Sequence, residues 1–134
     1  MIETGKLEEW ARDAIARPTE KARAALRAYC AKPQSAKRLH RARKALARLR
    51  AALQDLNELA RTPQEFRERV DELHRRAGKV RDADVQIQRI DEYLEDADRA
   101  ASLELCMLRD SLRDQRKRAR RKLRRTLRAV PEIL

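Results

Sequence analysis

Apolar residues recur along most of this chain at alternating intervals of three and four, the spacing that is typical of amphipathic helices. The clearest run predicts a helix over residues 36–61, for which Ser35 is the expected N-cap. Its apolar stripe consists of Leu39, Ala42, Leu46, Leu49, Leu53, Leu56 and Ala60. Because that stripe is narrow, we expect the helix to bury one face and to expose the other.

The region before this helix is also predicted to be helical, over residues 3–16 and 20–31, and Pro33 ends it. The apolar side of the first stretch is expected to consist of Leu7, Trp10 and Ala14. Pro18 interrupts the pattern and Thr19 can cap a restart. One kinked helix and two separate helices are therefore both compatible with the sequence.

Three further helices are predicted after residue 62. Thr62-Pro63-Gln64-Glu65 has the form of a capping box and predicts a helix over 63–77, which Gly78 ends in a left-handed conformation. The apolar positions of that helix are Phe66, Val70, Leu73 and Ala77.

Asp82 is the expected cap of the next helix, over 83–98, and Ser102 or a neighbouring residue begins the last one, over 102–129, which Pro131 ends. The apolar positions of the fourth helix are Val85, Ile87, Ile90 and Leu94. Those of the fifth are Leu105, Leu108, Leu112, Ala119, Leu123, Leu127 and Val130. The sequence thus predicts an all-α fold: one domain over 1–134, an antiparallel bundle of four to five helices.

Composition supports this fold class and excludes others. The 134 residues include 42% charged and 42% hydrophobic residues, 2 glycines and 3% aromatics, which excludes a β-sandwich and any glycine-rich nucleotide-binding motif. No apolar run is long enough to span a membrane, and the first residues do not resemble a signal peptide, so we expect a cytoplasmic protein. Cys30 and Cys106 are expected to be buried thiols in a reducing compartment, because no metal-ligand spacing joins them.

The formal net charge of +12 is unevenly distributed along the chain. Residues 37–50 contain seven basic residues and no acid, and residues 113–128 contain ten basic residues and one acid. Residues 82–98 contain seven acids and one base, Arg89. A solvated helix face normally intersperses acids with bases, so the runs of like charge predict an anionic ligand.

The basic residues of the second helix gather around one histidine. Arg43, Lys44, Arg48 and Arg50 all lie within about 80° of His40 on a helical wheel. Arginine binds phosphate oxygens in a bidentate manner, so a multiply charged phosphate ligand suits this face. An exposed helical histidine without a ligand is the alternative interpretation of His40, and His74 is expected to be structural.

Two motifs together resemble the CHAD family, the conserved histidine α-helical domain. The first is Leu39-His40-x-x-Arg43-Lys44-x-Leu46-x-Arg48-Leu49-Arg50, and the second is Ala77-Gly78-Lys79-Val80-Arg81-Asp82-x-Asp84-Val85. The resemblance covers roughly residues 20–128 and departs from the family at Ala47 and Ala77. It implies an all-helical basic domain of two repeated halves around a positive cavity that binds inorganic polyphosphate.

Carried over by position, the resemblance puts polyphosphate contacts at His40, Arg43, Lys44, Arg48, Arg50, Lys79 and Arg81. The chain holds only one copy of each motif, so it resembles a half-length member, and we expect a homodimer that supplies both halves. Association with polyphosphate granules is left open. The second wall of the cavity is predicted, from helical spacing, to consist of Arg113, Arg116, Lys117, Arg120 and Arg124.

We expect no catalysis, no cofactor and no metal, because no nucleophile–base pairing or acidic cluster accompanies the basic faces. Asp82 and Asp84 are expected to serve the start of their helix, or alternatively to orient Arg81 or a neighbouring arginine. Other functions remain as alternatives: binding of RNA or DNA through the phosphate backbone, with weak nonspecific binding in any case, a histidine phosphotransfer domain, or a purely structural helical partner.

Overall fold

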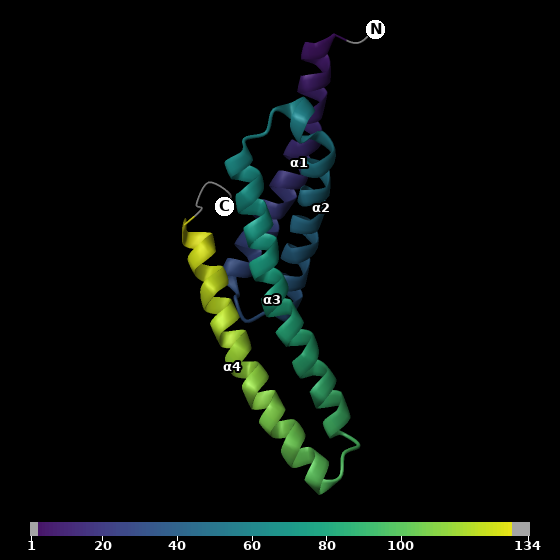
Figure 1. Ribbon diagram of the computed structural model, residues 1–134, viewed down its shortest axis with the longest axis vertical. Helices are drawn as coiled ribbons and strands as arrows, with labels where there is room; N and C mark the ends of the chain where they lie inside the picture. Colours follow the sequence, from purple (N-terminus) through teal and green to yellow (C-terminus); the bar gives the residue numbers. More distant parts are fainter. Residues whose placement is uncertain (1–2, 130–134) are drawn as a thin grey trace.

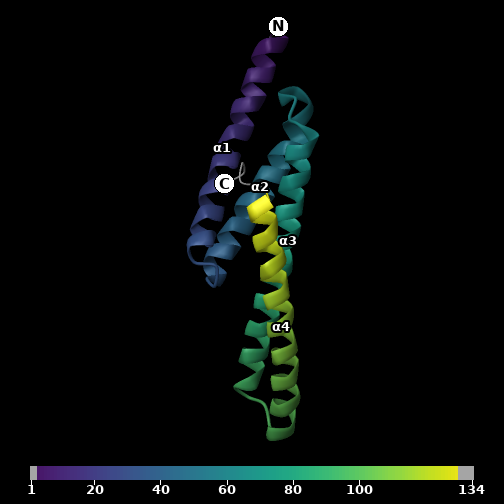
Figure 2. The ribbon, with the colours of Figure 1, turned by 90° about the vertical axis from the view of Figure 1, so that its left-hand side faces the viewer.

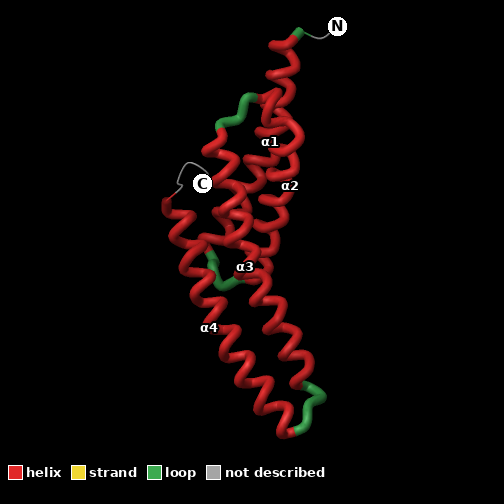
Figure 3. Tube along the Cα trace, viewed as in Figure 1, coloured by secondary structure: helices red, strands yellow, loops and turns green. Residues whose placement is uncertain are grey.

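The computed structural model describes residues 3–129, and these residues form four α-helices joined by short turns (Figures 1 and 3). The helices are α1 (Thr4–Ala31), α2 (Ala36–Ala60), α3 (Gln64–Leu94) and α4 (Arg99–Ala129). Each helix packs against the next one along the chain. The predicted all-α bundle is therefore confirmed, with four helices. None of the described helices is long and apolar enough to cross a membrane.

The molecule is elongated because the two halves of α3 pack against different helices (Figures 1 and 2). Its first half packs on the α1–α2 hairpin, whereas its second half extends past the α1–α2 turn and pairs with α4 alone (Figure 2). The N-terminus and the α3–α4 turn lie at opposite ends of the molecule. The distal halves of α3 and α4 thus form a projecting two-helix hairpin.

The buried residues divide into two clusters that follow this shape. The larger cluster joins α1, α2 and the first half of α3 to Leu123 and Leu127 near the end of α4. The smaller cluster lies inside the projecting hairpin and consists of Ile87, Ile90 and Leu112, with Leu94 and Leu105 packed beside them. The apolar stripe predicted for α2 is confirmed, since Leu56 is half-buried and the other six positions are buried.

Helix α1 is continuous through Pro18. Thr19 does not cap a second helix; its hydroxyl donates to the carbonyl oxygen of Ile15 at 2.8 Å, one turn back. The predicted apolar side of α1 was wrong in phase, because Trp10 is 58% exposed. The residues that α1 buries are Ala11, Ile15, Ala22, Leu26 and Tyr29.

The two helices predicted on either side of Gly78 are one helix, and the predicted caps were wrong. Gly78 lies inside α3, and no described glycine has a positive φ. Pro63 is the N-cap of α3 and no side chain caps it, while Glu65 instead accepts a hydrogen bond from Arg69 at 2.6 Å. Asp82 lies mid-helix. A continuous helix keeps Val80 fully buried in the larger cluster, and that burial outweighs the modest cost of a helical glycine.

Helix α4 begins slightly earlier than predicted, and Asp98, not Ser102, supplies the cap. The Asp98 carboxylate accepts a hydrogen bond from the backbone N–H of Ala101 at 2.8 Å. Leu108 was predicted to be buried and is 51% exposed, because only α3 covers this part of α4. Val130 and Pro131 lie outside the described residues.

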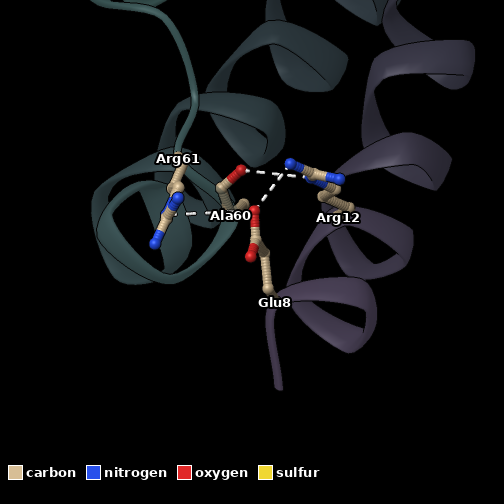
Figure 4. A network of polar contacts seen from close by, with 4 residues as sticks. All are labelled: Glu8, Arg12, Ala60 and Arg61. Carbon is tan, nitrogen blue, oxygen red and sulfur yellow. Dashed lines mark hydrogen bonds and ion pairs between the residues drawn. The ribbon is translucent and has the colours of Figure 1, made fainter. Parts of the chain in front are cut away.

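Two smaller features complete the fold. Cys30 is exposed and Cys106 is half-buried, and both are free, so the prediction of buried thiols was wrong. Arg12 of α1 donates to the carbonyl oxygen of Ala60 at 3.4 Å and pairs with Glu8 at 2.6 Å (Figure 4). This contact holds the C-terminal end of α2 against α1. It also places Glu8 3.9 Å from Arg61, whose backbone is left-handed (φ 52°).

Candidate functional site

Helices α2 and α3 run antiparallel and bring the first motif, on α2, beside His74 and the second motif of α3 in three successive places. Arg50 contacts His74 at 3.1 Å. A Cβ atom on Gly78 would lie 3.7 Å from Nε of Arg43. His40 lies close enough to Arg81 for that cation to lower the pKa of the imidazole. His40, Arg43 and Arg81, three of the residues that sequence reasoning chose, thus lie along one helix–helix seam.

Arg50 is held firmly at one end of this seam. Its Nε donates to Asp71 at 2.7 Å and its Nη1 donates to Nδ1 of His74. Because Nδ1 of His74 accepts this bond, its ring is neutral and carries its proton on Nε2. Burial, followed by the nearby Arg50 and Arg43, lowers the pKa of His74, which agrees with the neutral form.

At the other end of the seam, His40 lies among cations. Burial is the largest cause that lowers the pKa of His40, followed by the charges of Arg81, Lys44 and Arg43. Nδ1 of His40 and Nε of Arg43 are buried without a hydrogen-bond partner among the described residues. Unpaired polar groups of this kind have a free-energy cost, so the cluster is not arranged to maximise the stability of the isolated chain.

Carboxylates are scarce at this seam. Arg50 pairs with Asp71, whereas no ion pair joins Arg43, Lys44 or Arg81 to a carboxylate among residues 3–129. These three positive charges are therefore available to an external anion.

A second group of cations lies where α4 crosses α3. Asp84 is buried at 7% exposure and accepts a hydrogen bond from Arg116 at 3.1 Å, and Arg120 lies 4.0 Å from the same oxygen. Asp84 is mid-helix, so the prediction that it serves a helix start was wrong. The alternative use, orientation of a neighbouring arginine, is what the structure shows, and the arginines come from α4.

The arginines of α4 continue into a cavity of about 700 Å³ between the end of α1 and the second half of α4. Its cationic lining residues are Lys117, Arg120, Arg121, Arg124 and Arg128. No carboxylate of residues 3–129 lines it, and its other walls include Tyr29 and Cys30. Burial raises the pKa of Tyr29, and partial removal from solvent raises the pKa of the more exposed Cys30, so both side chains stay neutral at ordinary pH. The cavity therefore has the charge and size to hold a compact anion.

The two groups are connected across α3. Arg81, which lies beside His40, is three residues before Asp84, so their side chains are neighbours on the helix. Asp84 in turn contacts Arg116 and Arg120, and Arg120 lines the cavity. We call this path from the α2–α3 seam to the α4 cavity the basic band. Its members are His40, Arg43, Lys44, Arg50, Arg81, Arg116, Lys117, Arg120, Arg121, Arg124 and Arg128.

Three residues chosen from the sequence lie elsewhere. Arg48 lines a cleft beside Trp10 on the α1 side of α2. Lys79 lines a pocket on the other edge of the α3–α4 pair, with Asp82 and Arg118. Arg113 lies one turn nearer the hairpin tip than Arg116 and forms an ion pair with Asp110 at 3.8 Å.

Sequence reasoning missed Arg121, Arg128 and the contact between His74 and Arg50. The signal for the two arginines was present, because Lys117, Arg121, Arg124 and Arg128 follow the four-three-four spacing of one helix face. Among residues 3–129, no three His, Cys, Asp or Glu side chains come together as a metal site requires.

A comparison with known families identifies the family of this chain. The model of the CHAD domain matches residues 13–131, which include most of α1 and all of α2, α3 and α4. The chain belongs to the CHAD family. The CHAD match contains both motifs and every residue of the basic band. No curated protein and no solved structure matches the chain.

Proposed function

We propose that this CHAD-domain chain binds inorganic polyphosphate along the basic band. The observation that carries the proposal is the continuity of the band, in which cations from α2, α3 and α4 adjoin on rigid helices. The two carboxylates beside it, Asp71 and Asp84, orient arginines and leave Arg43, Lys44 and Arg81 to an external anion. Membership of a family associated with polyphosphate supports the same ligand.

Binding proceeds by neutralisation of successive phosphates and release of their counterions, so affinity falls steeply with salt. Arginines contact phosphate oxygens in a bidentate manner, and His40 supplies a further hydrogen bond. Of the outlying residues, Lys79 and Arg113 bind where a long polymer extends beyond the band, whereas Arg48 lies apart beside Trp10. The chain is a binding module in the cytoplasm and catalyses no reaction.

Polyphosphate fits the band better than single-stranded nucleic acid does. Single strands are usually held by exposed aromatic rings on which bases stack. Tyr29 is the aromatic residue beside the band among residues 3–129, and it is buried at 4% exposure. A polymer without bases needs no such platform.

The chain also acts as a homodimer. A half-length domain with one copy of each motif presents one basic band, and a second copy supplies another to the same polymer. Two linked bands bind a long polyanion more tightly than either band alone.

The first prediction concerns Arg43 and Arg81, which have no ion-pair partner in the described part of the chain. Replacement of both by alanine is expected to weaken polyphosphate binding by at least about a hundredfold, since each hydrogen bond to a charged group contributes about 1.5–3 kcal/mol and two are lost. The slope of log affinity against log salt concentration should also become shallower, by the equivalent of about one to two phosphate contacts. The measurement is a titration with labelled long-chain polyphosphate at two salt concentrations.

The matched control is Arg75→Ala, which removes an exposed cation of α3 outside the band. It is expected to change the affinity less than threefold, as is typical of a general charge effect. Equal losses in both variants, or equal displacement of polyphosphate by RNA and duplex DNA, would contradict the proposed site and indicate nonspecific binding to a basic surface.

A further inference from the structure

The projecting hairpin of α3 and α4 carries large apolar side chains that nothing in the described chain covers. Tyr93 and Met107 are each 68% exposed, Leu103 is 66% exposed and Leu108 is 51% exposed. Tyr93 and Leu108 line one pocket of about 530 Å³, together with Asp96 and Glu104. Leu103 and Met107 are four residues apart and share a face of α4 beside it. We call these six residues the tip patch.

The tip patch lies on a strongly acidic part of the molecule. Residues 90–110 contain seven carboxylates and two arginines, whereas the whole chain has a net charge of +12. Two paired helices that bury only the small cluster of Ile87, Ile90 and Leu112 are poorly stabilised by themselves. A partner for the tip patch therefore needs an apolar surface with a positive rim.

The same chain carries such a surface at the opposite end. A cleft of about 400 Å³ between α1 and α2 is lined by Trp10, Ala14, Pro18 and Ala45. Arg17, Lys21 and Arg48 surround it, with Asp13 as the one carboxylate among its lining residues. Trp10, which is 58% exposed, is the large apolar residue of this Trp10 cleft.

The positions of the two surfaces fit a pair of chains related by a two-fold axis. The tip patch belongs to the helix ends around the α3–α4 turn, and the Trp10 cleft is lined by residues 10–21 of α1 and 45–48 of α2. In Figure 1 the α3–α4 turn and the N-terminal half of α1 lie towards opposite ends of the elongated molecule. Two copies side by side in opposite directions would bring each tip to the end of the other copy that carries the cleft, so the same contact could form twice. Both contacts join an acidic apolar surface to a basic one.

We propose that the tip patch of one chain docks into the Trp10 cleft of a second copy, so that the homodimer is held by two equivalent contacts. This inference builds on the homodimer of the proposed function and identifies its surfaces. Association between two tip patches would place acidic surfaces together and is disfavoured for that reason.

A charge-exchange experiment on the full chain tests the contact. Glu104→Lys on the tip and Arg17→Glu in the cleft should each raise the dimer dissociation constant by about tenfold or more, because each puts like charges together. The double variant restores the attraction and should recover most of the loss. Glu58→Lys and Arg75→Glu are matched controls on exposed positions outside both surfaces, and they should leave the dissociation constant unchanged.

Sedimentation equilibrium gives the dissociation constants, and Trp10 gives a local reading, because it is the single tryptophan of the chain. Dimer formation should shift its fluorescence to shorter wavelength, and the two single variants should prevent that shift at the same concentration. A dimer that leaves the emission unchanged overturns the proposal. A dimer that Glu104→Lys strengthens also overturns the proposal, because it would indicate contact between two tips. An emission shift that an oligonucleotide causes and self-association does not cause would overturn it as well.

The polyphosphate titration separates this inference from the proposed function. Arg17 and Glu104 lie outside the basic band, so a monomeric Arg17→Glu variant should still bind short-chain polyphosphate with the affinity of a single band. If the chain is monomeric at high micromolar concentration and still binds polyphosphate, the docking surfaces are wrong and the proposed ligand stands. If it dimerises through these surfaces and binds no polyphosphate, the ligand is wrong and the docking surfaces stand.

Discussion

Two carboxylates determine how the cations of the basic band are presented. Asp71 accepts from Arg50 and Asp84 accepts from Arg116, so these guanidinium groups have fixed orientations. Arg43 and Arg81 have no such partner among residues 3–129 and keep their full charge for a ligand. The band therefore combines oriented arginines with uncompensated ones, an arrangement that suits a polymer with regularly spaced charges.

His40 of the basic band and the neighbouring His74 should give the proposed polyphosphate binding a pH dependence. Burial and nearby cations (Arg81, Lys44 and Arg43 for His40; Arg50 and Arg43 for His74) lower both pKa values, and Asp71 partly opposes this at His74. A bound polyanion raises the pKa of His40 again, so binding takes up a proton. Polyphosphate affinity should therefore rise as the pH falls from about 7.5 to about 5.5.

The stability of the free protein should change in the opposite direction. The folded state favours neutral His40 and His74. Their contribution to the free energy of unfolding is therefore fully present above the ordinary histidine pKa and is lost as the pH falls through the lowered values. Titrations at several pH values, with His40→Gln and His74→Gln, measure both effects. A pH profile of affinity that is unchanged in His40→Gln would contradict a role for His40 at the ligand.

Among the helices, α3 allows the clearest prediction about stability, at Gly78. Gly78 is helical, and an added Cβ would meet Nε of Arg43 at 3.7 Å, an ordinary van der Waals contact. Gly78→Ala should therefore stabilise the protein by about 0.5–1 kcal/mol, because alanine favours the helix and restricts the unfolded chain. Urea unfolding measures the change. A loss of stability would instead indicate the left-handed helix end that the sequence suggested.

The same helix shows why the helix boundaries were only partly predictable. The α2 stripe was correct because seven apolar positions agree in one phase, and Ser35 caps the helix as predicted, accepting from the Arg38 N–H at 3.2 Å. Gly78 and Asp82 are strong local signals for a break, yet the burial of Val80 and Asp84 maintains a single helix. Tertiary contacts of this kind are not visible in a window of a few residues.

The candidate site was predictable to a similar degree. The motif positions brought His40, Arg43 and Arg81 to one seam, and helical spacing placed Arg116, Lys117, Arg120 and Arg124 together on α4. Spacing shows which residues share a face but not which neighbour that face meets. Arg48 therefore came out beside Trp10, and Arg121 and Arg128 were missed although they line the cavity.

For the whole molecule, the distribution of charge and apolar surface matters more than any single residue. The basic band is built from residues of α2, α3 and α4. The α3–α4 end, whose residues are acidic, projects away from the α1–α2 hairpin (Figure 1). An isolated chain of this shape keeps its acidic end distant from its own basic surfaces. In the proposed assembly, a second copy in the opposite direction brings the two together.

The projecting hairpin also predicts two different lifetimes for hydrogen bonds within one helix. The distal half of α3 is protected by a cluster of three buried residues, whereas the first half belongs to the larger core. Native-state hydrogen exchange should therefore find that amides near residues 86–94 open locally, at a lower free energy than those near residues 70–80. Equal opening free energies would contradict this. If the two halves differ as expected, α3 consists of a stable half that carries part of the proposed ligand surface and a labile half. Hydrogen exchange in the labile half should slow when a second chain covers it.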